Sequence, residues 1–202
     1  MLTSNQQALI AMQNAISGFA IKIAAFMNAA GQEVHVEPQN PAGVPQETVD
    51  LRIKLIEEEV NKELIPALRA GNFEEIADGI ADVLYVVIGT ALTYGIPVGL
   101  TFDAVHDNNM TKVNLETGQC TRDENGKVLK PEGFKTVDLL TPLQAWDEAI
   151  RSMGGDVAFR TLVLDGYMKY YRSKMAGQTT IATRDNPNPE QLNALGRVLE
   201  TN

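Results

Sequence analysis

The sequence predicts an all-α fold: an antiparallel helical bundle with a small β-hairpin flap and extra helices towards the carboxyl end. Three features lead to this prediction. Apolar residues recur at helical spacing over most of the chain, and glycine and proline residues separate the helical stretches. One segment carries the Thr-Gly and Asn-Gly steps that are typical of hairpin turns.

The amino-terminal part of the chain is expected to form four helices. Gly31 ends the first, and a proline-rich connector leads to the second, which Pro66 is expected to end or kink. Asn72 and Glu75 resemble a capping box that opens the third helix, and Gly95 follows its end. The predicted helices span residues 5–30, 46–70, 72–94 and 98–108.

Residues 114–137 are expected to form the flap, as a β-hairpin or a long ordered loop. The stretch from Thr121 to Glu132 also approximates a calcium-binding loop. Its first position is a threonine, Pro131 precedes its last position, and no helix is expected to flank it. A hairpin turn is therefore the better interpretation.

The last third of the chain is expected to contain two more helices, separated by Gly154 and Gly155, and a short helix within residues 186–202. This organisation divides the chain into residues 1–138, a helical domain that includes the flap, and residues 139–202, a helical extension of unknown role. The aromatic residues of the extension are expected to pack a core or a subunit contact, with stacking on a base as the alternative. These residues are Trp146, Tyr167, Tyr170 and Tyr171.

Composition excludes several classes of function. The chain carries 17 basic and 26 acidic residues, a net charge of -9, which disfavours general nucleic-acid binding and anionic membranes. A small phosphorylated ligand remains compatible, because a bound divalent cation reverses the local charge. With one cysteine, Cys120, and two histidines, the chain offers no internal disulfide and little for zinc. We expect a reducing, cytoplasmic environment.

Residues 83–102 are uncharged over a length that is sufficient to span a bilayer. They include several glycine, threonine and proline residues, and Asp82 and Asp103 flank them in place of basic anchors. A buried helix followed by a turn explains the stretch better than a membrane span.

Carboxylates form a stripe on each of two consecutive predicted helices. Glu59 and Glu63 share one face of the second helix, and Asp78 and Asp82 share one face of the third, with Glu75 nearly in line. The connection between these helices is short, so we expect them to pack antiparallel with the stripes facing each other. The alternative is a solvated acidic face, which we prefer for Glu57 and Glu74.

The surroundings of Asp82 favour a metal site. Its helix is apolar nearly all round, so Asp82 is expected to be buried, and no Lys or Arg occurs from Gly71 to Thr111. A buried carboxylate needs a partner, a raised pKa or a metal ion. Two carboxylates about 5 Å apart repel by roughly 3 kcal/mol at an effective dielectric of 20, and further carboxylates add to this. Oxygen ligands suit Mg²⁺ or Mn²⁺. A di-iron site is disfavoured, because neither His35 nor His106 forms a Glu-x-x-His motif.

The stretch from Leu55 to Leu64, followed by Glu75 to Tyr85, resembles the MazG-like all-α nucleotide pyrophosphohydrolases, specifically the phosphoribosyl-ATP pyrophosphohydrolase-like branch. The family signature is Glu-Glu-x-x-Glu on one helix and Glu-x-x-Asp on the next. The likeness spans about residues 16–138, and further matching stretches lie at 88–92, 105–113 and 126–130.

The resemblance implies Mg²⁺-dependent hydrolysis of a nucleoside triphosphate, such as a dNTP, between the α and β phosphates, with Mn²⁺ as an alternative ion. Two positions depart from the signature: its third glutamate falls on Lys62, and the glutamate of its second half falls on Gly79. Glu59 is the candidate proton acceptor. The expected metal ligands are Glu58, Glu59, Glu63, Asp78 and Asp82, with Glu75 as a ligand or an outer-sphere group.

Substrate contacts are expected from Asn109 and Lys112, which follow the fourth helix, and from Lys127 and Lys130 on the flap. For Lys112, an exposed solubilising lysine is an equal alternative. We expect a homodimer or homotetramer, because four helices with an open acidic cleft leave apolar surface to cover. The rival hypotheses are a catalytically inactive helical module that binds a nucleotide or a protein partner, and a di-iron oxidoreductase.

Overall fold

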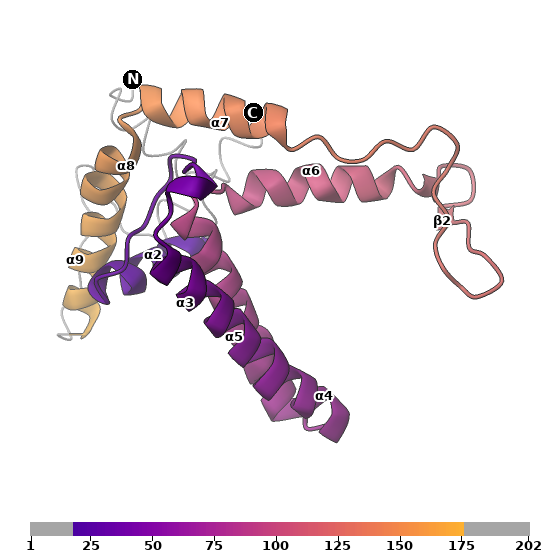
Figure 1. Ribbon diagram of the computed structural model, residues 1–202, viewed down its shortest axis with the longest axis horizontal. Coiled ribbons are helices and arrows are strands. Elements are labelled where there is room, and N and C mark those ends of the chain that lie inside the picture. Colours follow the sequence, from indigo (N-terminus) through magenta and orange to yellow (C-terminus); the bar gives the residue numbers. More distant parts are fainter. Residues whose placement is uncertain (1–17, 176–202) are drawn as a thin grey trace.

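The computed structural model describes residues 18–175, which form an all-α protein with a small two-stranded hairpin (Figure 1). The predicted fold class is confirmed. Residues 5–17 of the first predicted helix and the helix predicted within 186–202 lie outside the described residues. The helices are α2 (Gly18–Ala29), α3 (Gln46–Glu57), α4 (Ile65–Ala70), α5 (Phe73–Thr93), α6 (Val98–Met110), α7 (Leu140–Ser152), α8 (Gly155–Ala158) and α9 (Asp165–Met175). A 3₁₀ turn, η1 (Pro41–Gly43), and two π-helical segments, η2 (Glu58–Leu64) and η3 (Phe159–Leu164), complete the set.

Helix α3, η2 and α4 follow one another without interruption, so Pro66 does not end the second predicted helix. In a regular α-helix the ring of Pro66 would clash with the carbonyl of the residue four positions earlier. Here the N–H of Ile65 donates to the carbonyl of Val60, five residues back, which is the wider π-helical turn. The π-helical segment therefore absorbs the proline and keeps the helix continuous.

Helix α5 runs back along η2 and α3 to form a helical hairpin. Gly71, in the left-handed conformation with φ 65°, ends α4, and the side chain of Asn72 accepts the N–H of Glu75 at the start of α5. Gly79 lies at the closest approach of the two helices, because a Cβ atom there would lie 3.1 Å from the Cα of Leu64. A larger residue at this position would push the helices apart.

The core lies between α2, the carboxyl end of α5 and the helices of the extension. The connector between α2 and α3 joins these parts: Val34 and Val36 are buried in the core, and the indole N–H of Trp146 donates to the carbonyl of Val36 at 2.7 Å. Phe159 and Ile150 are fully buried in the same core. The extension thus packs directly on the helices that precede it, and Trp146 is a core residue as expected.

Helix α5 is more exposed than its apolar sequence indicates. Ile80 and Leu84 remain 48% and 54% exposed, and the residues that are buried belong mostly to the carboxyl half of the helix. By length and composition α5 is also apolar enough to cross a membrane, a property it shares with the core helices of soluble proteins. In the structure α5 packs along η2, α2 and α3.

Helix α6 diverges from the α3–α5 hairpin and carries the β-hairpin at its far end (Figure 1). Strand β1 (Val113–Asn114) pairs antiparallel with β2 (Gln119–Cys120), and an isolated bridge joins Arg122 and Val128. The carboxylate of Asp123 accepts the N–H groups of Asn125 and Lys127 and so closes the second turn. The predicted hairpin is confirmed, and we refer to residues 111–138 as the arm.

Candidate metal centre

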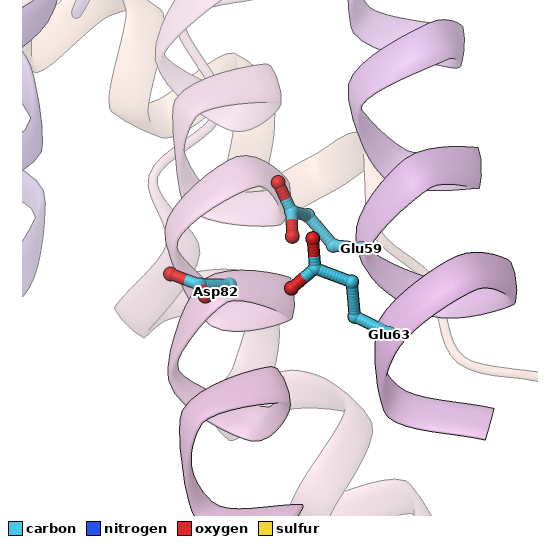
Figure 2. Close-up of side chains that lie close together, drawn as sticks. All are labelled: Glu59, Glu63 and Asp82. Carbon is cyan, nitrogen blue, oxygen red and sulfur yellow. The ribbon is translucent and has the colours of Figure 1, made fainter. Parts of the chain in front are cut away.

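Three carboxylates from two helices meet beside the contact at Gly79. Glu59 and Glu63 extend from η2 towards the neighbouring helix α5, which carries Asp82 (Figure 2). One oxygen atom of each carboxylate lies within 4.8 Å of the others. We call Glu59, Glu63 and Asp82 the acidic cluster. The helical hairpin thus brings together residues that are far apart in the sequence.

The surroundings of Glu59 oppose its ionisation. Partial burial raises the pKa of Glu59, and the negative charges of Glu63 and Asp82 raise it further. Glu58 and Asp78 also raise this pKa, so their charges lie within reach of the cluster. Within residues 18–175, no Lys, Arg or His nitrogen lies within 4.0 Å of a carboxylate of the acidic cluster. The repulsion is therefore uncompensated by the protein.

Two other acidic residues have different surroundings. Glu58 is 40% exposed, and one of its oxygens lies 3.5 Å from the ammonium of Lys62, one turn along the same helix. Lys62, at the position where the family signature has a glutamate, is thus paired outside the acidic cluster. Glu75 is exposed at the start of α5, where its backbone N–H is capped by Asn72, and its charge is absent from the groups that raise the pKa of Glu59.

Gly79 explains the second departure from the signature. A Cβ atom at this position would lie 3.1–3.3 Å from backbone and side-chain atoms of Leu64, so a glutamate has no room while the helices keep this spacing. The glycine instead permits the close approach that places Asp82 beside Glu59 and Glu63. The sequence comparison with the family signature made Gly79 look like a missing ligand. A close helix contact was nevertheless indicated, because Gly79 lies one turn before Asp82 on a helix that was expected to pack antiparallel.

The donor set fits a hard divalent cation. Carboxylate oxygens suit Mg²⁺ or Mn²⁺, which retain water ligands in open sites of this kind. A cation among the three oxygens would remove the repulsion that raises the pKa of Glu59. Since the cluster contains no histidine or cysteine, zinc is poorly served here, and the Glu-x-x-His pattern of di-iron bundles is absent from it.

None of the expected substrate-binding residues belongs to the acidic cluster: Asn109 lies in the last turn of α6, and Lys112, Lys127 and Lys130 lie on the arm. The Lys112 ammonium donates to Asn109 Oδ1 at 2.6 Å and lies 5.3 Å from the ring centroid of Phe134, while Lys130 lies 5.0 Å from the same centroid. Lys127 belongs to the turn that Asp123 closes. In Figure 1 the arm extends away from the α3–α5 hairpin of its own chain.

The fold and the site together define a helical protein with a carboxylate cluster suited to a hard divalent cation. Comparison with known proteins refines this class: residues 24–109 match the phosphoribosyl-ATP pyrophosphohydrolase family. The matching family belongs to the MazG-like nucleotide pyrophosphohydrolase superfamily and depends on divalent metal ions. The resemblance inferred from the carboxylate motifs is confirmed.

A curated relative is an uncharacterized protein of Acanthamoeba polyphaga mimivirus, which is 48% identical over 50 residues. The match covers 25% of this chain and 20% of that protein, so the chain spans about a fifth of the relative's length. This similarity adds no information about activity.

Proposed function

We propose that the protein hydrolyses a nucleoside triphosphate, such as a dNTP, between the α and β phosphates in a Mg²⁺-dependent reaction that yields the nucleoside monophosphate and pyrophosphate. The observation that carries the proposal is the convergence of Glu59, Glu63 and Asp82 within 4.8 Å, without a basic partner among the described residues. The match of residues 24–109 to a pyrophosphohydrolase family supports the same activity.

The acidic cluster would hold Mg²⁺, with Glu58 and Asp78 close enough to contribute charge or an outer ligand. When bound, the ion neutralises phosphate charge and lowers the pKa of a coordinated water. Glu59 is the proposed acceptor of the proton of the attacking water, because its carboxylate lies beside the position that the ion would occupy. Mn²⁺ has the same ligand preference and is expected to replace Mg²⁺.

We propose that Asn109, Lys112, Lys127 and Lys130 contact the phosphates or the sugar of the nucleotide. Lys112 and Lys130 have no carboxylate within 4.0 Å in the part of the chain that the structure describes, so both ammonium groups are available to an anion. Because the arm extends away from its own acidic cluster, these residues would serve the cluster of another copy in a homodimer or homotetramer. The exposed apolar face of α5 supports such an assembly. The reducing, cytoplasmic location expected from the sequence is part of the same proposal.

The direct test is a panel of NTPs and dNTPs incubated with the protein and Mg²⁺, followed by measurement of pyrophosphate and nucleoside monophosphate. Asp82→Asn is expected to lower kcat/KM at least about 100-fold, which corresponds to about 2.7 kcal/mol of transition-state stabilisation. The matched control is Glu57→Gln, which removes an exposed carboxylate next to the cluster on the same helix. Its activity should stay within about twofold of the wild type.

The two rival hypotheses predict different results. Tight nucleotide binding without release of pyrophosphate by the wild-type protein identifies an inactive binding module. Iron absorbance in the purified protein identifies a di-iron protein. If the wild type and Asp82→Asn are equally active, the acidic cluster does not take part in the reaction.

A further inference from the structure

A second polar site lies where the connector between α2 and α3 passes the helical extension. Residues of the connector alternate there: Val34 and Val36 are 0% and 3% exposed, whereas Glu33 and His35 lie on the accessible side. Alternate residues of an extended chain point to the same side, so Glu33 and His35 face in one direction. Both line a cavity of about 180 Å³.

The extension fixes the orientation of His35. Its Nδ1 atom lies 2.7 Å from Asp156 Oδ2, and the other oxygen of Asp156 accepts the backbone N–H groups of Val36 and Glu37 at 2.6 and 3.1 Å. Because an ionised carboxylate only accepts hydrogen bonds, Nδ1 carries the proton and Nε2 is left to face Glu33. A carboxylate that holds one ring nitrogen of a histidine in this way is typical of metal-binding histidines.

The distance between the two connector side chains is suited to a shared metal ion. His35 Nε2 lies 3.6 Å from Glu33 Oε2, which is longer than the usual N–H···O distance of about 2.7–3.2 Å. A cation placed about 2.1 Å from each atom would see them at an angle of roughly 120°, which is compatible with a tetrahedral site. The gap is too wide for a good hydrogen bond and fits a coordinated ion.

We propose that Glu33 and His35 chelate a divalent transition-metal ion of the Zn²⁺ class, with Asp156 as the outer carboxylate. Gln39 and Thr48 also line the cavity and offer oxygen atoms, and water can fill the remaining positions. Imidazole nitrogen favours Zn²⁺, Ni²⁺ or Cu²⁺, whereas the all-oxygen acidic cluster favours Mg²⁺. This site is independent of the hydrolytic function proposed above.

The test is a calorimetric titration of Zn²⁺ into the full-length protein in excess Mg²⁺, which occupies the acidic cluster. The wild-type protein should bind one equivalent that is lost in Glu33→Gln and in His35→Ala. Asp156→Asn should weaken this binding by about 10- to 100-fold, the usual effect of removing an outer carboxylate. The matched control is His106→Ala, since the second histidine of the chain stacks on Phe102 of α6, and it should leave the binding unchanged.

Glu33→Gln keeps the proposal testable if His35→Ala fails to fold, because the Glu33 side chain is 79% exposed and does not contribute to the core. Circular dichroism in the absence of Zn²⁺ checks that this variant retains the helical fold. Wild-type protein that binds no Zn²⁺, or Zn²⁺ affinity that is equal in wild type and Glu33→Gln, would overturn the proposal.

Discussion

The α3–α5 hairpin and the arm both carry residues that the sequence marked as functional, but the two regions differ in how those residues are assembled. In the hairpin, Glu59, Glu63 and Asp82 converge because helical periodicity places them on facing sides of two antiparallel helices. On the arm, Lys112 and Lys130 converge on Phe134 through a fold of short strands and turns. Periodicity thus predicts which residues share a face, and it carries no information about where a non-helical arm extends.

Separating the two helices of the α3–α5 hairpin should have the largest effect. Gly79→Ala places a Cβ atom 3.1 Å from the Leu64 Cα and should lower the free energy of unfolding by about 1–3 kcal/mol through overpacking. Activity should fall together with stability, because the acidic cluster is built across this contact. Chemical denaturation and the pyrophosphate assay measure the two effects.

Gly166→Ala in α9 is the matched control, because a Cβ atom there meets no neighbour within 4 Å. We expect it to be neutral or to stabilise the protein by up to about 1 kcal/mol. If both glycine variants behave alike, the close contact at Gly79 does not set the spacing of the helices.

The second prediction concerns binding of Mg²⁺ at the hairpin. The pKa of Glu59 is raised in the folded protein, so the folded state keeps this proton at pH values where the unfolded chain has lost it. The metal-free protein therefore loses stability as pH rises through the pKa that Glu59 has in the folded state. Above that pH, Mg²⁺ no longer competes with a proton for Glu59. At a concentration 100 times its Kd, Mg²⁺ adds about 2.7 kcal/mol and raises Tm by about 5–10 °C.

This increase in Tm should be larger at pH 8 than at pH 5, and it should disappear in Asp82→Asn. Differential scanning fluorimetry with and without Mg²⁺ measures it. An increase that is independent of pH would indicate that the ion binds away from Glu59.

The third prediction tests the arm. Lys112→Ala combined with Lys130→Ala removes both ammonium groups beside Phe134. We expect KM to rise about tenfold while kcat changes less than about threefold, because these groups contribute to binding in both ground and transition states. An Asp82→Asn chain mixed with the lysine double variant should regain activity if the arm serves another copy.

If the mixture regains no activity, the arm does not serve the acidic cluster of another copy. Unchanged kinetics of the lysine double variant would make Lys112 and Lys130 ordinary surface residues.

The smallest effect is expected at Lys62. Its ion pair with Glu58 is largely solvent-exposed, so Lys62→Met should change the free energy of unfolding by less than about 1 kcal/mol. Activity should remain within about threefold, because Lys62 lies outside the acidic cluster. A large loss of activity would give Lys62 a direct role with the nucleotide.

The sequence predicts the helices of the fold, because apolar residues recur at helical spacing. It also predicts that Glu59 and Asp82 lie on facing sides of neighbouring helices, because acidic residues recur at the same spacing. The sequence left open whether Pro66 ends or kinks the second helix, since the π-helical turn before it depends on hydrogen bonds that propensities do not describe. The partial exposure of α5 was also missed, because an apolar sequence does not reveal whether its partner lies in the same chain. Pairing of His35 with Asp156, 121 residues apart, depends on tertiary packing alone.

If acids from two helices bind one cation, as we propose, a double-mutant cycle of Mn²⁺ affinity will reveal the coupling between them. Glu59→Gln and Asp82→Asn should each weaken Mn²⁺ binding at least about tenfold, and the double variant should lose less than the sum of the two effects, because both residues contact the same ion. Two losses that add fully, or a single variant with wild-type affinity, would contradict a shared site.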